Sequence, residues 1–140
     1  MRRGPTVLSA VILMLLLNVS FAADKQRFDG NWQTTVSCEG SRGALGFSYR
    51  FMSAVKDGVF HGVHGTESQP GSLVIDGTIS PDGKASLYAK GRTGSKEFVA
   101  GRDTPPGTDF GYNINAQFEG ATGSGTRIEG RPCILKFEKQ

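Results

Sequence analysis

The sequence is poor in the residues that build catalytic and metal sites. Its 140 residues include only two cysteines and two histidines, and it contains no CxxC, HExxH or Gly-x-Ser-x-Gly sequence. Those patterns typically mark redox, zinc-hydrolase and serine-hydrolase sites. His61 and His64 lie three residues apart in an expected strand, which places them on opposite faces and disfavours a shared metal ion. We therefore expect a protein that is not an enzyme and uses no cofactor.

Long apolar stretches are also scarce, and the one present lies at the N-terminus. Arg2 and Arg3 precede an apolar run over residues 7–19, and Ser20-Phe21-Ala22 follows it. A basic start, a short apolar core and a small-x-small exit predict a cleaved secretory signal peptide. The run is shorter than the roughly 20 residues of a transmembrane helix. We expect residues 1–22 to be removed and residues 23–140 to form one domain, in the periplasm or outside the cell, with no membrane span.

An excess of charge of one sign is missing from the expected mature chain. The full sequence has 16 basic and 13 acidic residues, but two of the basic ones, Arg2 and Arg3, lie in the predicted signal peptide. A nearly neutral mature chain gives no reason to expect a nucleic acid partner.

Helical periodicity is absent after residue 22, and apolar residues alternate there instead. Such runs, separated by glycine and proline, predict strands joined by turns. The expected strands cover residues 31–38, 45–51, 59–66, 73–80, 85–91, 98–103, 110–119 and 126–138. Asp57-Gly58 predicts a hairpin turn with two positive φ angles. Residues 120–125 are interpreted as a glycine-rich turn.

Cys38 and Cys133 lie on the first and last expected strands. An even number of cysteines in an exported protein favours a disulfide. Closure of the sheet would make these two strands neighbours and would remove both exposed sheet edges. The sequence therefore predicts an all-β fold of about eight antiparallel strands in an up-and-down closed barrel with one disulfide. A two-sheet β-sandwich is the alternative.

Gly30-Asn31-Trp32, at the head of the first strand, resembles the Gly-x-Trp opening of the calycins, the superfamily of lipocalins and avidins. The likeness extends to eight antiparallel strands over nearly the whole mature chain. Asp29-Gly30-Asn31-Trp32, with the downstream Asp-Gly turns, also resembles small exported bacterial proteins. The resemblance implies structural roles for Gly30 and Trp32, and a basic residue of the last strand placed over the tryptophan.

The expected disulfide identifies that basic residue. If Cys38 faces Cys133 in an antiparallel pair, Trp32 faces Lys139. Lys139 or Lys136 is then the candidate partner of the tryptophan. Arg131 would lie opposite Gly40, at the far end of the barrel.

Aromatic residues alternate on two of the expected strands and predict a common inner face. They are Phe47, Tyr49, Phe51, Phe110, Tyr112 and Phe118. They either fill the barrel or line a ligand cavity, which typically combines apolar walls with a few polar groups. On the second interpretation the candidate ligand-binding residues are Tyr49, Phe51, Tyr88, Arg92, Phe110 and Tyr112.

Two functions from different classes remain. The first, implied by the calycin resemblance, is an exported non-catalytic barrel that binds a small, partly apolar ligand. The second is a protein-interaction module, for example an inhibitor of a lytic or proteolytic enzyme, acting through a loop such as residues 104–109. A structural envelope protein with no discrete ligand is a further alternative. An open interior of several hundred Å³ would favour ligand binding. A filled interior with an ordered, exposed loop would favour the protein-interaction module.

Overall fold

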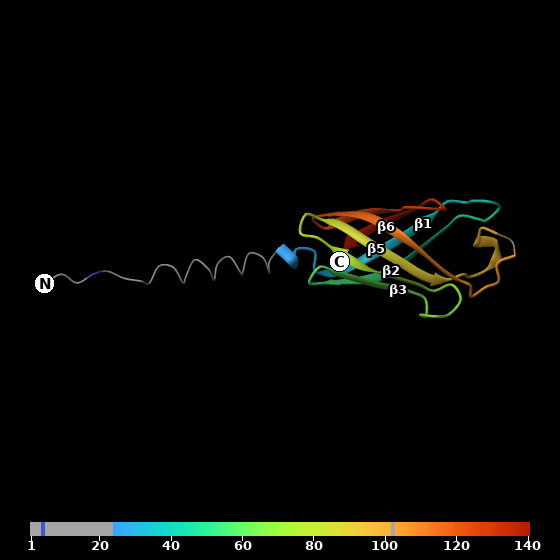
Figure 1. The fold of residues 1–140 in the computed structure, drawn as a ribbon, viewed down its shortest axis with the longest axis horizontal. Helices are drawn as coiled ribbons and strands as arrows, with labels where there is room; N and C mark the ends of the chain where they lie inside the picture. The colour runs from blue at the N-terminus through green and yellow to red at the C-terminus, as the bar shows by residue number, and fades with distance from the viewer. Residues whose placement is uncertain (1–3, 5–23, 102) are drawn as a thin grey trace.

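Eight antiparallel strands close into a barrel in sequence order, as the computed structural model shows (Figure 1). The model describes residues 24–101 and 103–140 together with Gly4, so the rest of the predicted signal peptide lies outside the described residues. The elements are β1 (Gly30–Cys38), β2 (Phe47–Lys56), β3 (Val59–His64), β4 (Leu73–Ile79), β5 (Lys84–Arg92), the 3-10 helix η1 (Lys96–Phe98), β6 (Asp109–Glu119), β7 (Thr122–Arg127) and β8 (Cys133–Lys139). The predicted all-β barrel is confirmed and the sandwich is excluded. In the described part of the chain, no helix is both long and apolar enough to cross a bilayer.

The register between the first and last strands is the one that the cysteines predict. Cys38 pairs with Cys133 and their sulfur atoms are bonded, while Trp32 pairs with Lys139. The side chain of Lys139 passes over Gly30, where a Cβ would lie 2.9 Å from its Cε atom. A larger residue at position 30 would therefore displace the lysine.

Two of the eight predicted strands were wrong, and the errors cancel in the count. Residues 98–101 and 103 form no strand, because the chain leaves the sheet after β5 and Phe98 is the last residue of η1. The stretch predicted as one strand over residues 126–138 is divided between β7 and β8, and β7 includes most of the predicted glycine-rich turn. The hairpin at Asp57-Gly58 is confirmed, with φ angles of 51° and 75°.

Aromatic side chains pack the end of the barrel at which β1 begins. Trp32, Phe60, Phe118 and Phe137 are fully buried there. The Trp32 ring meets Phe118 edge-on at 5.0 Å, and its Nε1 atom donates a hydrogen bond to the carbonyl oxygen of Phe28 at 2.9 Å. This end of the interior is filled.

The chain segment before β1 covers the packed end. Phe28 is buried, and its ring lies 5.9 Å from that of Phe118. The Asp29 carboxylate accepts hydrogen bonds from the backbone N–H groups of Asp57 and Gly58, at 2.9 and 3.3 Å. The segment is therefore fastened to the β2–β3 hairpin. It lies at the opposite end of the barrel from η1 (Figure 1).

Candidate ligand cavity

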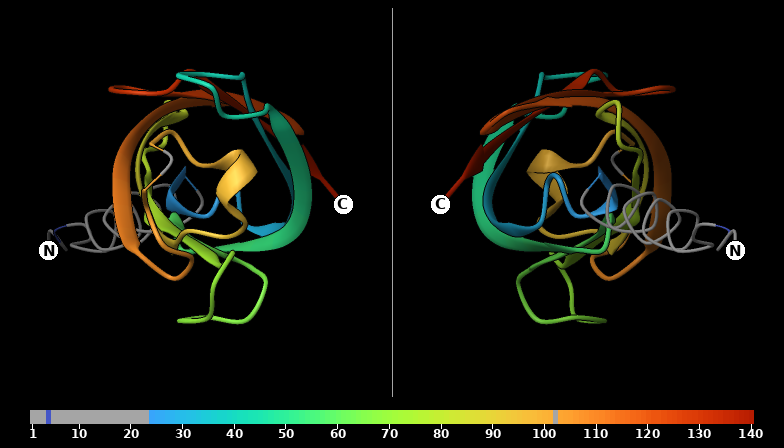
Figure 2. Two further views of the ribbon diagram at one scale, coloured as in Figure 1. Left: turned by 90° about the vertical axis from the view of Figure 1, so that its right-hand side faces the viewer. Right: turned by 90° about the vertical axis from the view of Figure 1, so that its left-hand side faces the viewer.

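The end of the barrel near η1 encloses a cavity of about 590 Å³. The segment that carries η1 lies across the opening of the ring of strands (Figure 2). The lining residues come from most of the strands and from the loops at this end: Cys38, Ser41, Arg42, Phe47, Tyr49, His64, Gly71, Ser72, Arg92, Thr93, Gly94, Ser95, Phe98, Val99, Ala100, Phe110, Tyr112, Arg127, Gly130 and Arg131. The interior thus has a packed end and an open end.

Two pairs of parallel aromatic rings form much of the cavity wall. On β2, the rings of Phe47 and Tyr49 are stacked with their centroids 5.5 Å apart, and on β6 those of Phe110 and Tyr112 are stacked at 6.2 Å. Residues two apart in a strand point to the same face, so both pairs lie on the interior side of the barrel. His64 of β3 extends the first pair, since its ring stacks on Tyr49 at 4.0 Å.

The tyrosine hydroxyls and a histidine nitrogen supply polar groups. Burial raises the pKa of the Tyr49 phenol, and the neighbouring Tyr112 phenol raises it further. Burial also raises the pKa of Tyr112, against the opposing effect of the Arg127 cation. Both phenols are therefore neutral near neutral pH. His64 Nδ1 is buried and has no hydrogen-bond partner among the described residues.

Two arginine side chains lie on the aromatic wall. The Arg127 guanidinium carbon sits 4.3 Å from the centre of the Tyr112 ring, and that of Arg131 sits 4.9 Å from the centre of the Phe47 ring. Both contacts are of the cation–π type. Arg42 and Arg92 also line the cavity, and none of its described lining residues is acidic. The cavity is therefore apolar on its walls and positive in charge.

Arg131 holds the loops of the open end together. Its guanidinium donates hydrogen bonds to three backbone carbonyl oxygens, those of Glu39, Leu45 and Phe98. The backbone N–H of Leu45 in turn donates to the carbonyl oxygen of Glu97 at 2.7 Å. One side chain thus joins the β1–β2 loop to η1.

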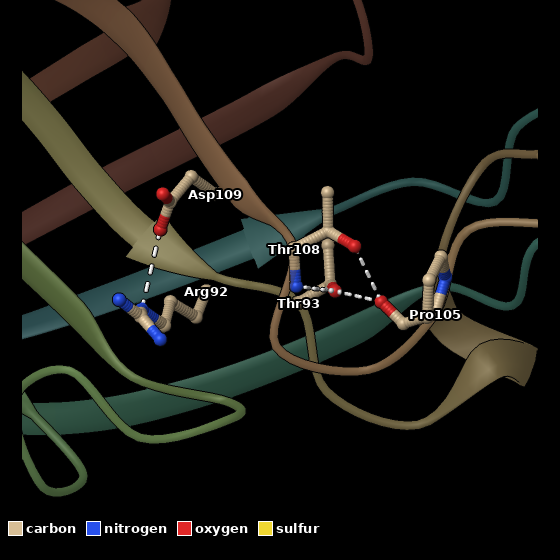
Figure 3. A network of polar contacts seen from close by, with 5 residues as sticks. All are labelled: Arg92, Thr93, Pro105, Thr108 and Asp109. Carbon is tan, nitrogen blue, oxygen red and sulfur yellow. Dashed lines mark hydrogen bonds and ion pairs between the residues drawn. The ribbon is translucent and has the colours of Figure 1, made fainter.

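The base of the loop that carries η1 is fastened by a polar network (Figure 3). The Thr93 hydroxyl donates to the carbonyl oxygen of Pro105 at 2.9 Å and accepts from the backbone N–H of Thr108 at 3.0 Å. The Thr108 hydroxyl donates to the same carbonyl at 2.6 Å. Arg92, which lines the cavity, forms an ion pair with Asp109 at 3.2 Å. These contacts fix both ends of the loop.

Four of the six predicted ligand-binding residues line the cavity: Tyr49, Arg92, Phe110 and Tyr112. Phe51 does not line it, but contacts two residues of the wall, with ring centroids 6.2 Å from Tyr49 and 5.9 Å from His64. Tyr88 was wrongly placed, because it is 49% exposed on the outer face of β5, where it lies over Gly111. The structure therefore brings together four of the six and separates Tyr88 from them.

The sequence prediction missed several residues of the cavity. Arg127 was absent from it because the glycine-rich strand β7 was not recognised. Phe98 was assigned to a strand, and its ring in fact packs edge-on against Phe47 at 6.2 Å. His64 was not among the predicted ligand-binding residues, but it lies in the cavity wall. The alternation of Gly123, Gly125 and Arg127 is the one signal that would have placed the arginine inside.

The residues predicted to have structural roles are found at the packed end. Trp32 is buried, but it contacts Phe28 and Phe118, and the cation–π contacts of the described residues involve Arg27, Arg127 and Arg131. The expected stacking of a basic residue on the indole is therefore absent from the described contacts, although Lys139 has the predicted register. Arg131 lies at the opposite end, as the disulfide register required.

The two histidines point to opposite sides of β3. His61 lies outside, with its Nδ1 atom 2.5 Å from an oxygen of Asp76, and His64 lines the cavity. No cluster of three or more His, Cys, Asp or Glu side chains suited to a metal ion occurs within residues 24–101 and 103–140.

Comparison of the chain with models of known protein families, with curated proteins and with solved structures found no match. The calycin resemblance therefore rests on the Gly-x-Trp sequence and on the up-and-down barrel, and stays a prediction.

Proposed function

We propose that this protein is an exported, non-catalytic barrel that binds a small, partly apolar molecule in the cavity beneath η1. The observation that carries the proposal is the cavity itself. Its volume of about 590 Å³ lies within the range of about 300–1,000 Å³ that is typical of small-molecule sites. An interior packed only by its own side chains would have left no such space.

The chemistry of the wall supports the same conclusion. Stacked rings on β2 and β6 make the wall largely aromatic, while the Tyr49 and Tyr112 hydroxyls and His64 Nδ1 are polar groups that can orient a ligand. A buried nitrogen without a partner loses free energy that a bound polar group restores. This observation favours ligand binding over action through loops alone.

Export is part of the proposal. The N-terminal 22 residues have the features of a signal peptide. The Cys38–Cys133 disulfide is compatible with export, because such bonds persist in oxidising compartments.

A neutral fluorescent probe tests the binding function. N-phenylnaphthylamine consists of a phenyl ring and a naphthalene joined by an amine, carries no charge, and its emission rises in an apolar site. We expect it to bind the purified protein saturably. The Ser95→Trp variant, which places a bulky ring at the mouth, should weaken binding by about tenfold or more. The matched variant Ser86→Trp, on the exposed face of β5, should bind as the native protein does.

The outcome that overturns the proposal is equally concrete. If the probe does not bind, or if Ser95→Trp and Ser86→Trp bind it equally, the cavity is not a ligand site. Native mass spectrometry of the protein purified from its own cell envelope gives an independent measurement. A retained small molecule that the Ser95→Trp variant lacks would support the proposal.

A further inference from the structure

The cavity has a surplus of positive charge that no described residue of its wall neutralises. Four arginines line it, and Asp109 pairs with only one of them, Arg92, at 3.2 Å. The described part of the chain contains no other salt bridge to an arginine. Arg127 and Arg131 therefore carry unpaired charges on an aromatic wall, where such charges are less well solvated than in bulk water.

The two terminal nitrogens of the Arg127 guanidinium are free to donate hydrogen bonds to a ligand. Its Nε atom donates to the carbonyl oxygen of Glu129 at 2.6 Å, and its plane lies over the Tyr112 ring. Among the described residues, neither of its terminal nitrogens has a hydrogen-bond partner. These two nitrogens form the fork that binds the paired oxygens of a carboxylate, phosphate or sulfonate.

Arg131 adds a second positive charge close by. Burial lowers the pKa of Arg131, and the charge of Arg127 lowers it further, so the two guanidinium groups repel each other. Three backbone carbonyls orient Arg131 but carry no negative charge. An anion bound next to both groups would remove the repulsion.

We propose that the ligand of this cavity is an amphiphilic anion, whose anionic group binds the free terminal nitrogens of Arg127 beside Arg131 and whose apolar body contacts the aromatic side chains of β2 and β6. His64 Nδ1, which lacks a partner in the described residues, is available to a polar group of the same ligand. This inference rests on the proposed binding function and adds the charge of the ligand to it.

A pair of probes that differ only in charge tests the inference. Anilinonaphthalene sulfonate has the ring system of N-phenylnaphthylamine with a sulfonate group added. The native protein should bind the sulfonate probe at least about tenfold more tightly than the neutral probe, since hydrogen bonds between charged groups are stronger than those between neutral groups. Arg127→Gln should remove most of this preference, so that the affinities of this variant for the two probes lie within about threefold of each other.

Two variants separate the guanidinium from general charge effects. Arg127→Lys retains the charge but loses the fork, so we expect an intermediate preference for the sulfonate. Arg50→Gln removes one arginine charge from the exposed face of β2, and should leave both affinities unchanged.

Equal affinity of the native protein for the two probes, tighter binding of the neutral probe, or the same loss of preference in Arg50→Gln as in Arg127→Gln would overturn the inference. Because the neutral probe would still bind at the cavity, the proposed function would stand in that case. If neither probe binds, both proposals fail.

Competition identifies the anionic group. Naphthoate, naphthyl phosphate and neutral naphthol share one ring system and can each be used to displace the sulfonate probe. Stronger displacement by naphthoate indicates a carboxylate ligand, and stronger displacement by naphthyl phosphate indicates a phosphate ester. If naphthol competes as well as both anions, the anionic group contributes nothing and the inference is wrong.

Discussion

The rings of Phe118 and Phe137 meet at 4.7 Å, although their strands β6 and β8 are not neighbours. Between them, β7 contributes Gly123, which pairs with Phe118 on one side and with Phe137 on the other. A Cβ on Gly123 would lie 3.0–3.2 Å from the atoms of the Phe118 ring. The missing side chain is therefore what allows the two phenylalanines to fill this end of the barrel.

Replacement of Gly123 by leucine should destabilise the protein. The added side chain has no space beside Phe118, and overpacking of this kind costs about 1–3 kcal/mol in the free energy of unfolding. Denaturant unfolding measures the loss. Ser124→Leu, on the exposed face of the same strand, should change the free energy by no more than about 0.5 kcal/mol. Equal effects of the two substitutions would contradict the packing described here.

Removal of the disulfide should lower the stability substantially. The bond closes a sequence separation of 95 residues, for which chain-entropy arguments give roughly 4–5 kcal/mol and measured losses are commonly about 2–5 kcal/mol. We expect the Cys38→Ser/Cys133→Ser variant to unfold at correspondingly lower denaturant concentration.

The same variant should keep its packed end intact while it remains folded. Trp32 is six residues from Cys38 along β1, a distance of about 20 Å in an extended strand. The emission spectrum of this single tryptophan should therefore be unchanged before unfolding. A red-shifted spectrum under native conditions would show that the two ends of the barrel do not pack independently.

The buried phenols predict a loss of stability at alkaline pH. Below the ordinary tyrosine pKa near 10, the folded and unfolded chains both keep the proton. Above it, the unfolded chain releases the proton first, because the pKa of Tyr49 and that of Tyr112 are raised in the fold. The free energy of unfolding should therefore fall as the pH rises above about 10.

Phenolate absorbance measures this directly. In a Tyr88→Phe background the two cavity tyrosines are the only phenols left, and both should ionise above the ordinary tyrosine pKa near 10. Tyr49→Phe should reduce the alkaline loss of stability. Ionisation of both phenols near pH 10 in the folded protein would show that they are not buried.

Arg131 should control the rigidity of the open end. Arg131→Met removes the hydrogen bonds to Glu39, Leu45 and Phe98, so the β1–β2 loop and η1 should separate more often. The backbone N–H of Leu45, bonded to the Glu97 carbonyl, should then exchange with deuterium faster. Arg50→Met on the outer face of β2 should leave the rate unchanged. An unaltered rate in Arg131→Met would exclude this role.

The sequence predicted the fold wherever large apolar side chains mark the inner face. β4 was found because large apolar residues alternate in it, at Leu73, Ile75 and Ile79. β6 was found for the same reason, at Tyr112, Ile114 and Phe118. β7 was missed because its inner residues are mostly glycines, whose space is taken by side chains of β6. An alternating pattern predicts a strand only where large apolar side chains line its inner face. A strand whose inner face consists mainly of glycines shows no such pattern.

The site could be predicted only in part, for related reasons. The alternation that put Leu87 and Ala89 inside also places Tyr88 outside, so its selection as a ligand contact was inconsistent with the pattern itself. The position of η1 depends on bonds from Arg131 to residues 33 and 86 positions away. A local sequence pattern contains no information on such distant contacts, so the position of η1 over the cavity could not be predicted from the sequence.

The ring of strands is not equally stiff all the way round. At the open end, the seam between β1 and β8 is closed by a covalent bond. The ladder between β2 and β3 runs only from Ser53–Gly62 to Lys56–Val59, and beyond it the stacked rings of Tyr49 and His64 bridge the two strands. One flank of the rim is therefore joined by a covalent bond and the other by a contact between rings, so β2 and β3 are held together less firmly at the open end than β1 and β8.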